Sequence, residues 1–425
     1  MHFSNHILLR NIILFIVLFL IDLYAYQAFK TLAKKYSDKT KKRIRIGYLL
    51  VSTFCFTVLL IAGFYNWHDW NKYFRTYAFA ILLIIMWTKL MIDIFLLVDD
   101  LIRLFRWIIK KITNKVHEAT PEKPAKTENA ISRSDFLVKT GLLIASIPFF
   151  SLVYGMVANA TNFKIRKVKL PLPNLPDSFE GFRIVHISDI HTGSFTSTEP
   201  LERAVNLINE QKADAVFFTG DLVNDICDET LPYLNILNKI KATHGVFSIF
   251  GNHDYGDYYN WQNEDDKKKN LENLKHVHQQ LGWDLLLDEY RHIEKNGERI
   301  SVLGIQNCGA MGFSNYGSIK KATENLDYSP VNILLSHDPS YWKKEITKNY
   351  PQIDITLSGH THGMQFGVEI PGFKWSPVQY IYKEWADLYS VKKQYLYVNR
   401  GLGFIGYPGR VGILPEITVM ELSKT

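Results

Sequence analysis

The hydrophobic and polar positions divide the chain into two parts with different patterns. Before residue 160, the apolar residues form long runs with charged segments between them, at approximately residues 7–26, 46–65, 77–98 and 136–157. A helix needs about 20 apolar residues to cross a bilayer. The four runs therefore predict a membrane region of about four transmembrane helices over residues 1–160. A removable signal peptide is the main alternative for the first run, but the run has no clear small-residue cleavage site.

After residue 160, short apolar segments alternate with amphipathic ones. The pattern predicts strands at residues 183–188, 213–219, 246–250, 300–305, 331–336 and 353–358, and helices at residues 201–211, 231–240 and 266–281. Alternation of this kind indicates α/β layers around a buried sheet. We therefore expect a separate globular domain over residues 161–425. Ligands of such domains bind beyond the carboxyl ends of the strands.

The charge of the segments between the apolar runs predicts an orientation in the membrane. Residues 27–45 and 103–133 are rich in lysine and arginine, whereas residues 66–76 contain only Lys72 and Arg75. Because positive charge marks cytoplasmic loops, both basic segments are expected inside and both termini outside. The globular domain is then extracytoplasmic, on a bacterial inner membrane or a plasma membrane.

Two shorter features belong to the end of the membrane region. Residues 118–126 contain Pro121 and Pro124, which predicts a flexible stretch. The sequence from Ser132 to Leu137 resembles a degenerate twin-arginine export motif; alternatively, it is a basic residue at the cytoplasmic end of a helix. Both interpretations place the following domain outside.

The composition makes several classes of function less plausible. The 425 residues carry a formal net charge of +7, yet the cations lie between apolar runs, so nucleic-acid binding is disfavoured. Cys55, Cys227 and Cys308 are too few and too scattered for a disulfide framework or a zinc knuckle. Asp22 and Asp93 lie in or near apolar runs and are interpreted as helix-packing or interfacial residues, because the spans lack the polar interior residues of a transport path.

Five predicted strand ends carry residue types that bind metal ions. They supply Asp189 and His191, Asp221, Asn252 with His253 and Asp254, His337, and His360 with His362. A single histidine or aspartate at such a place is more often structural, but a set of five indicates a metal site. Imidazole and carboxylate ligands suit zinc, iron or manganese, whereas calcium prefers oxygen ligands throughout. Positions i and i+2 of an extended chain project to the same side, so both paired motifs are expected to supply two ligands.

These motifs, D-x-H, G-D, G-N-H-D, a lone H and G-H-x-H, occur in this order within residues 182–422. Together they resemble the calcineurin-like metallophosphoesterase superfamily. Phosphoprotein phosphatases have an arginine near the G-D motif, whereas here Leu222, Val223 and Asn224 follow Asp221. The chain is more similar to the membrane-associated bacterial branch, which includes relatives of lipid-linked UDP-sugar hydrolases, and to four-span transmembrane proteins with a metallophosphoesterase domain. The implied fold is a four-layer α/β/β/α sandwich preceded by a four-helix transmembrane region.

The resemblance also implies a site with two divalent metal ions, manganese, iron or zinc. One ion would be bound by Asp189, His191 and His362, the other by Asn252, His337 and His360, and Asp221 would bridge them. Two ions about 3.5–4 Å apart activate a bridging water and stabilise both the attacking and the leaving oxygen. The implied reaction is attack of that hydroxide on phosphorus. His253 would protonate the leaving group and Asp254 would orient the His253 imidazole.

The substrate is less defined by the sequence. Arg400 and Arg410, in a glycine-rich segment, are candidates for binding substrate phosphate, with an ordinary surface arginine as the alternative for each. Aromatic residues are dense after Asn252 and at residues 373–389, and they could wall the site, contact lipid or form the core of a lid. We expect a phosphate mono- or diester, with a phospholipid or lipid-linked phosphate as one hypothesis. The alternatives are a periplasmic phosphomonoesterase or nucleotidase, and a non-catalytic membrane sensor of phosphorylated ligands.

Overall fold

A computed structural model describes residues 5–65, 70–113 and 133–424 of the protein. The chain divides into two compact units, Met1–Val153 and Tyr154–Thr425, which we describe separately. Residues 118–126, for which a flexible stretch is expected, lie outside the described residues, as does Ser132 at the start of the export-like motif.

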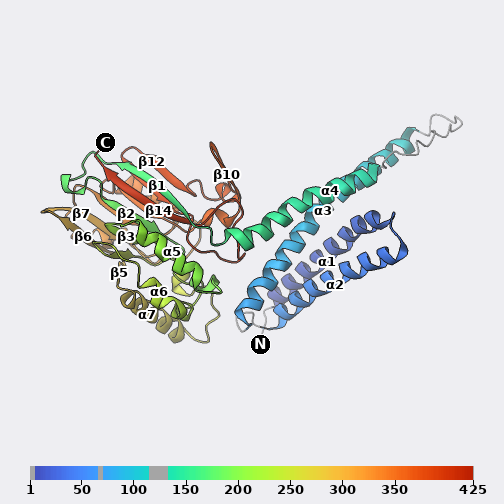
Figure 1. The fold of residues 1–425 in the computed structure, drawn as a ribbon, viewed down its shortest axis with the longest axis horizontal. Helices are drawn as coiled ribbons and strands as arrows, with labels where there is room; N and C mark the ends of the chain where they lie inside the picture. The colour runs from blue at the N-terminus through green and yellow to red at the C-terminus, as the bar shows by residue number, and fades with distance from the viewer. Residues whose placement is uncertain (1–4, 66–69, 114–132, 425) are drawn as a thin grey trace. The chain divides into compact units, whose positions relative to one another are not determined.

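The first unit consists of long apolar helices (Figure 1). They are α1 (Asn5–Ala33), α2 (Asp38–Phe64), α3 (Lys72–Thr113) and α4 (Arg133–Tyr154). All four are long and apolar enough to cross a membrane, which agrees with the predicted spans. The helices extend beyond the apolar runs, so most of the first basic segment is helical. Ser37 caps α2 by accepting a hydrogen bond from the Thr40 amide.

A buried polar network joins α1, α2 and α3. The Asp22 carboxylate forms an ion pair with Lys89 and accepts a hydrogen bond of 2.6 Å from the Ser52 hydroxyl. The Tyr48 hydroxyl donates to the Asp22 backbone carbonyl. The sequence expectation that the spans lack polar interior residues is therefore wrong here. The interpretation of Asp22 as a helix-packing residue agrees with these contacts.

The second unit contains two six-stranded sheets. The first has the order β1 (Lys164–Pro171), β14 (Glu416–Ser423), β2 (Arg183–Ile187), β3 (Ala215–Phe218), β4 (Val246–Ser248) and β5 (Trp283–Leu285). The strands from β2 to β5 are parallel, and β14 lies parallel to β1 and antiparallel to β2. The first strand of the unit therefore pairs with β14, the strand farthest from it in sequence.

The second sheet has the order β12 (Asp387–Val391), β13 (Gln394–Val398), β9 (Ile355–Ser358), β8 (Asn332–Leu335), β7 (Glu298–Gly304) and β6 (Glu289–Lys295). Its four middle strands are parallel and its two edge strands antiparallel to their neighbours. A separate hairpin, β10 (Val368–Ile370) and β11 (Phe373–Trp375), follows β9 in the sequence.

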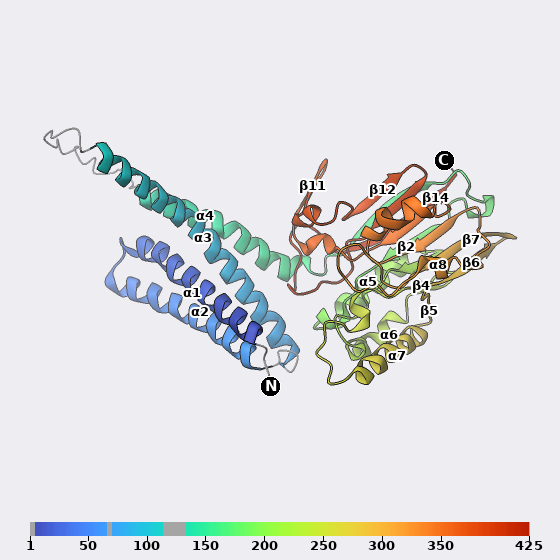
Figure 2. The same ribbon diagram turned by 180° about the vertical axis from the view of Figure 1, so that it is seen from behind.

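Apolar side chains fix the order of the layers. Phe217 of the first sheet and Ile333 of the second belong to one buried cluster between the two sheets. On the outer face of the first sheet, Val216 packs in a cluster with residues of α5 (Glu199–Glu210) and α7 (Glu264–Gln280). Figures 1 and 2 show these helices on that face, together with α6 (Leu234–Leu237).

The outer face of the second sheet is covered by shorter helices. Leu334 packs there with Trp342 and with Ile319 of α8 (Ile319–Ala322), and α9 (Thr347–Asn349) follows. The four-layer α/β/β/α prediction is confirmed.

The predicted strands are present, but the predicted helix at residues 231–240 is wrong. Residues Cys227–Tyr233 form a 3₁₀ helix, and only the single turn α6 follows it. Pro232 lies within the 3₁₀ segment and has no backbone N–H to donate. The apolar residues have helical spacing, but with Pro232 in the segment the chain forms a 3₁₀ helix and one α-helical turn, not a long α-helix.

Candidate metal centre

Both sheets contribute side chains to one buried site. Asp189 and His191 follow β2, Asp221 follows β3 and Asn252 follows β4; His337 follows β8, and His360 and His362 follow β9. These are the carboxyl ends of parallel strands, where ligands of α/β folds bind. The structure therefore brings together all seven ligand candidates that the sequence indicates, and they form two neighbouring clusters.

The first cluster consists of Asp189, His191 and His362, all buried, whose ligand atoms all lie within 4.8 Å of one another. The Nε2 atoms of His191 and His362 are 3.0 Å apart, and Asp189 Oδ1 is 3.2 Å from His362 Nε2. Two imidazole nitrogens and a carboxylate oxygen thus converge on one point.

The second cluster consists of Asp221, His337 and His360, again within 4.8 Å. Asn252 joins it, because its Oδ1 lies 3.1 Å from His337 Nε2 and 2.8 Å from His360 Nδ1. Asp221 Oδ2 lies 3.1 Å from His337 Nε2 and 3.6 Å from His191 Nε2. This carboxylate oxygen therefore reaches both clusters.

Hydrogen bonds outside the clusters orient two of the four histidines so that Nε2 can bind a metal ion. His191 Nδ1 donates to the Val223 carbonyl at 3.2 Å, and His337 Nδ1 donates to the Thr219 carbonyl at 2.7 Å. Because a carbonyl can only accept, the proton of each neutral ring is on Nδ1 and the lone pair of Nε2 faces the cluster. This donor set fits two divalent ions of the zinc, iron or manganese type.

At five of the seven ligand positions the backbone is left-handed, not extended. Asp189, His191, Asp221, His360 and His362 have φ angles of 51°, 50°, 59°, 69° and 50°. The expectation that the paired motifs lie in an extended chain is therefore wrong. A non-glycine residue in this region costs roughly 1–2 kcal/mol. Such strain concentrates at functional sites, where the surrounding structure holds it in place.

Two glycines of the motifs are required by close packing. A Cβ atom on Gly251 would lie 2.2 Å from Asp221 Oδ1, and one on Gly359 would lie 2.0 Å from Ser188 Oγ. Any side chain at either position would displace the groups that form the site.

His253 lies beside the first cluster and is only partly buried. Its ring is 5.0 Å from that of His191 and 4.5 Å from that of Tyr258, between centroids. Its Nδ1 donates to the Asn224 carbonyl at 2.6 Å. The partner that orients this imidazole is thus a backbone carbonyl and not Asp254, and the expectation for Asp254 is wrong.

Asp254 supports the backbone of the site instead. Its carboxylate accepts hydrogen bonds of 2.8 Å from the amides of Asp221, Leu222 and Gly251. Burial and the charge of Asp221 raise the pKa of Asp254 to about 7. The carboxyl group of Asp254 therefore holds the Asp221 turn in the left-handed conformation described above.

The two arginines differ from the sequence expectation. Arg400 is fully buried, and its guanidinium pairs with Glu416 at 2.6 Å, Asp387 at 2.7 Å and Glu369 at 2.8 Å. Arg410 is also fully buried, and it donates to the carbonyls of Gly401 and Gly403 and lies 3.2 Å from His362 Nδ1. Both are interior residues bonded within the protein, so the expectation that they bind substrate phosphate is wrong.

Two tyrosines contact candidate metal ligands, and the motifs alone do not reveal these contacts. The Tyr382 hydroxyl lies 2.8 Å from His360 Nε2, and the Tyr258 hydroxyl accepts a bond of 2.9 Å from Asn252 Nδ2. The only sequence signal was the density of aromatic residues after the metal motifs. Other members of that set differ, since Tyr380 is 71 % exposed and Phe373 is 53 % exposed.

A four-layer sandwich with two His/Asp clusters at its strand ends defines a metal-dependent phosphoesterase. Residues 182–364 match the family described as calcineurin-like phosphoesterase. Residues 6–160 match a probable transmembrane domain of calcineurin-like phosphoesterases. The chain belongs to the calcineurin-like phosphoesterase family and is a membrane-associated hydrolase.

Curated relatives are similar over much of the chain. The metallophosphoesterase YkuE of Bacillus subtilis is 31 % identical over 59 % of this chain and 82 % of its own length. The transmembrane protein with metallophosphoesterase domain of Danio rerio is 30 % identical over 70 % of this chain and 65 % of its own length. The match thus spans just under two thirds of the Danio rerio protein.

Proposed function

We propose that the protein is a dinuclear metal-dependent phosphoesterase that hydrolyses phosphate mono- or diesters, with a lipid-linked phosphoester as its preferred substrate. The observation that carries the dinuclear assignment is the position of Asp221, one oxygen of which is 3.1 Å from His337 and 3.6 Å from His191. A carboxylate shared by two histidine clusters is the arrangement expected for a bridging ligand.

In this proposal each cluster holds one ion. Asp189, His191 and His362 hold the first, and Asn252, His337 and His360 the second. The ions would supply Lewis-acid activation of water and neutralise charge on the phosphate. His253 would act as an imidazolium: Nδ1 keeps its proton on the Asn224 carbonyl, and Nε2 would give the second proton to the leaving oxygen, which leaves the neutral ring.

Exposed apolar residues that follow the ligand motif favour a lipid-linked substrate. Ile370 is 58 % exposed and Phe373 is 53 % exposed in the β10–β11 hairpin, and Ile381 beyond it is 52 % exposed. Ile370 and Phe373 are paired across the hairpin, and exposed apolar residues that lie together mark contact with lipid, ligand or protein. These residues follow the ligand candidate His362 by 8, 11 and 19 positions in the sequence.

Hydrolysis of aryl phosphate esters tests the catalytic assignment. The purified chain with added manganese should cleave an aryl phosphodiester or monoester, and Asp221→Asn and His253→Ala should abolish or strongly reduce turnover. Asp228→Asn is the matched control, because Asp228 is exposed and lies seven positions beyond Asp221. Metal-bound protein without turnover on any ester would favour the sensor alternative.

A second comparison tests the lipid-linked substrate against soluble monoesters or nucleotides. The double variant Ile370→Ser/Phe373→Ser should lose activity on a phosphoester carried in vesicles but retain activity on a soluble aryl ester. Leu231→Ser is the control, since Leu231 is 55 % exposed elsewhere in the second unit, Tyr154–Thr425, which we call the catalytic unit. Higher activity on soluble monoesters, with no effect of the hairpin variant, would support the soluble-substrate alternative.

We also infer that the catalytic unit is extracytoplasmic. The inference rests on the excess of lysine and arginine around the α1–α2 connection. In a bacterial host, an alkaline phosphatase fused after residue 160 should be active, because that reporter folds only after export. An inactive fusion that is expressed and stable would reverse the orientation.

A further inference from the structure

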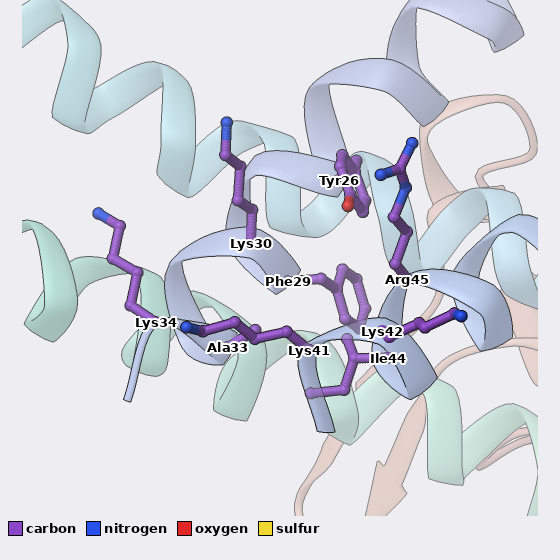
Figure 3. Close-up of a pocket in the computed structure, with 9 residues that line it drawn as sticks. All are labelled: Tyr26, Phe29, Lys30, Ala33, Lys34, Lys41, Lys42, Ile44 and Arg45. Carbon is purple, nitrogen blue, oxygen red and sulfur yellow. The ribbon is translucent and has the colours of Figure 1, made fainter. Parts of the chain in front are cut away.

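The first unit, Met1–Val153, which we call the membrane unit, contains a cavity of about 470 Å³ between α1 and α2, close to the connection that joins them (Figure 3). We refer to it as the basic cavity. It is lined by Tyr26, Phe29, Lys30, Ala33, Lys34, Lys41, Lys42, Ile44 and Arg45.

The rim of the basic cavity is strongly cationic. Lys30 comes from α1, Lys34 from the connection that follows α1, and Lys41, Lys42 and Arg45 come from α2. Among the described residues that line the cavity, none is acidic. The nearest acid in the sequence, Asp38, pairs with Lys41 at 3.0 Å and offsets one of the five charges. A net positive charge therefore remains around the cavity.

The floor of the cavity is apolar and fixed. The rings of Tyr26 and Phe29 each pack on Tyr48 with centroids 5.1 Å apart. Tyr48 in turn donates to the Asp22 carbonyl, within the buried network that joins α1, α2 and α3. In Figure 3 the rings of Tyr26 and Phe29 occupy the middle of the view, with the cationic side chains spread around them.

We propose that the basic cavity binds the phosphate-bearing headgroup of an anionic membrane lipid. Its volume is within the range of about 300–1,000 Å³ for small-ligand sites. It lies at the ends of two candidate spans, where basic hollows between helices bind anionic headgroups. The cations pair with the phosphate, while the aromatic floor contacts the glycerol and the first acyl carbons. This site lies in the membrane unit and is independent of the proposed hydrolysis.

A charge-matched pair of double variants tests the proposal. Lys30→Gln/Arg45→Gln removes two charges that line the cavity. Lys35→Gln/Lys39→Gln removes two exposed charges from the same segment that do not line it. Native mass spectrometry of the full chain in detergent would measure binding of dioleoylphosphatidylglycerol and of dioleoylphosphatidylcholine. We expect preferential retention of phosphatidylglycerol, weakened by at least about tenfold in the cavity variant only.

Each of the other possible results would overturn a specific part of the proposal. Equal weakening in both variants would show general attraction to the basic segment and overturn the cavity as a site. Equal retention of the two lipids by the wild type would overturn the assignment to an anionic headgroup. A third arm uses inorganic phosphate as competitor. If it displaces the lipid at micromolar concentration, the ligand is a free phosphate and not a lipid. Circular dichroism of both variants excludes loss of the helices as the cause.

Discussion

Both units of the molecule bury charged groups, but the partners of the buried carboxylates differ between the two units. In the membrane unit, the Asp22 carboxylate meets a cation from the protein itself, Lys89, with Ser52 as a further donor. In the catalytic unit, Asp189 and Asp221 face the imidazoles of His362 and His337. In the membrane unit, protein groups alone pair with the Asp22 carboxylate. In the catalytic unit, the carboxylates and imidazoles surround two positions that could each hold a metal ion.

The comparison separates a structural use of buried charge from a chemical one. A buried ion pair contributes little net stability when intact but destabilises strongly when one partner is removed. A cluster of donors, by contrast, gains its stability from the ion it binds. Changes in the membrane network should therefore affect helix assembly alone, and changes in the metal clusters should affect turnover first.

Removal of metal should give the largest effect. Dialysis against a chelator should reduce hydrolysis to background and lower the melting temperature of the catalytic unit, because bound ions stabilise only the folded clusters. The helical circular dichroism of the membrane unit should not change. Added manganese should restore the activity. Full turnover by protein shown to be metal-free would contradict the assignment of both clusters.

Lys89→Met should test the membrane network. It leaves Asp22 buried without its cation, so the helices should lose about 3–5 kcal/mol of unfolding free energy, measured by titration with a denaturing detergent. Turnover of a soluble ester should be unchanged. The double variant Asp22→Asn/Lys89→Met should recover part of the loss, because no uncompensated charge remains. An unaltered unfolding curve for Lys89→Met would show that the ion pair has no structural role.

Acid should destabilise the catalytic unit through His278, a buried histidine that is not one of the ligand candidates. Burial lowers the pKa of His278 to about 3, and its Nδ1 lies 2.9 Å from the Ser248 hydroxyl. Between pH 6.5 and 3, the unfolded chain binds a proton that the folded one does not, so stability falls as pH falls. The loss attributable to this group is about 3 kcal/mol at pH 4.

His278→Gln should remove that share of the pH dependence while keeping a partner for Ser248. His276→Gln, at an exposed position of the same helix, should leave the dependence as in the wild type. The measurement is the melting temperature of the catalytic unit from pH 7 to pH 4. Parallel curves for both variants and the wild type would exclude His278 as a source.

Tyr382→Phe should give the smallest effect. It removes the hydroxyl that lies 2.8 Å from His360 Nε2, so the ring loses the contact that helps hold Nδ1 toward the second cluster. Metal affinity and turnover should each fall by about tenfold. Tyr380→Phe, at a 71 % exposed position two residues away, is the control. Equal metal affinity in both variants would exclude Tyr382 as a positioning residue.

The sequence was most informative where a signal is local. The spans, the strands that follow them and the seven ligand candidates all rest on apolar runs or short motifs, and the structure contains these spans and strands and brings the ligand candidates together. The motifs could not reveal the backbone conformation. Asp189 and His191 have the spacing of alternating strand residues, but both are left-handed, and Gly359 packs directly against Asp189.

Other features depend on partners distant in sequence. Arg400 looks like a phosphate ligand until Glu369, Asp387 and Glu416 are placed around it, and only the fold brings these carboxylates together. The same is true of Lys89, whose partner Asp22 lies on another helix. The partner of a charged residue cannot be read from the sequence. A prediction from sequence therefore rests on the residue type alone.

The pairing of β1 with β14 has a consequence for how the protein is made. Ser423 of β14 donates to the carbonyl of Leu170 in β1, which lies 253 positions earlier in the chain. β1, which follows the fourth span in the sequence, is therefore synthesised long before β14, the strand that pairs with it. Until then β1 and β2 both present open edges, which attract other strands. Insertion of β14 between them is the closing step of assembly, and a nascent chain already held in a membrane must remain unpaired until it occurs.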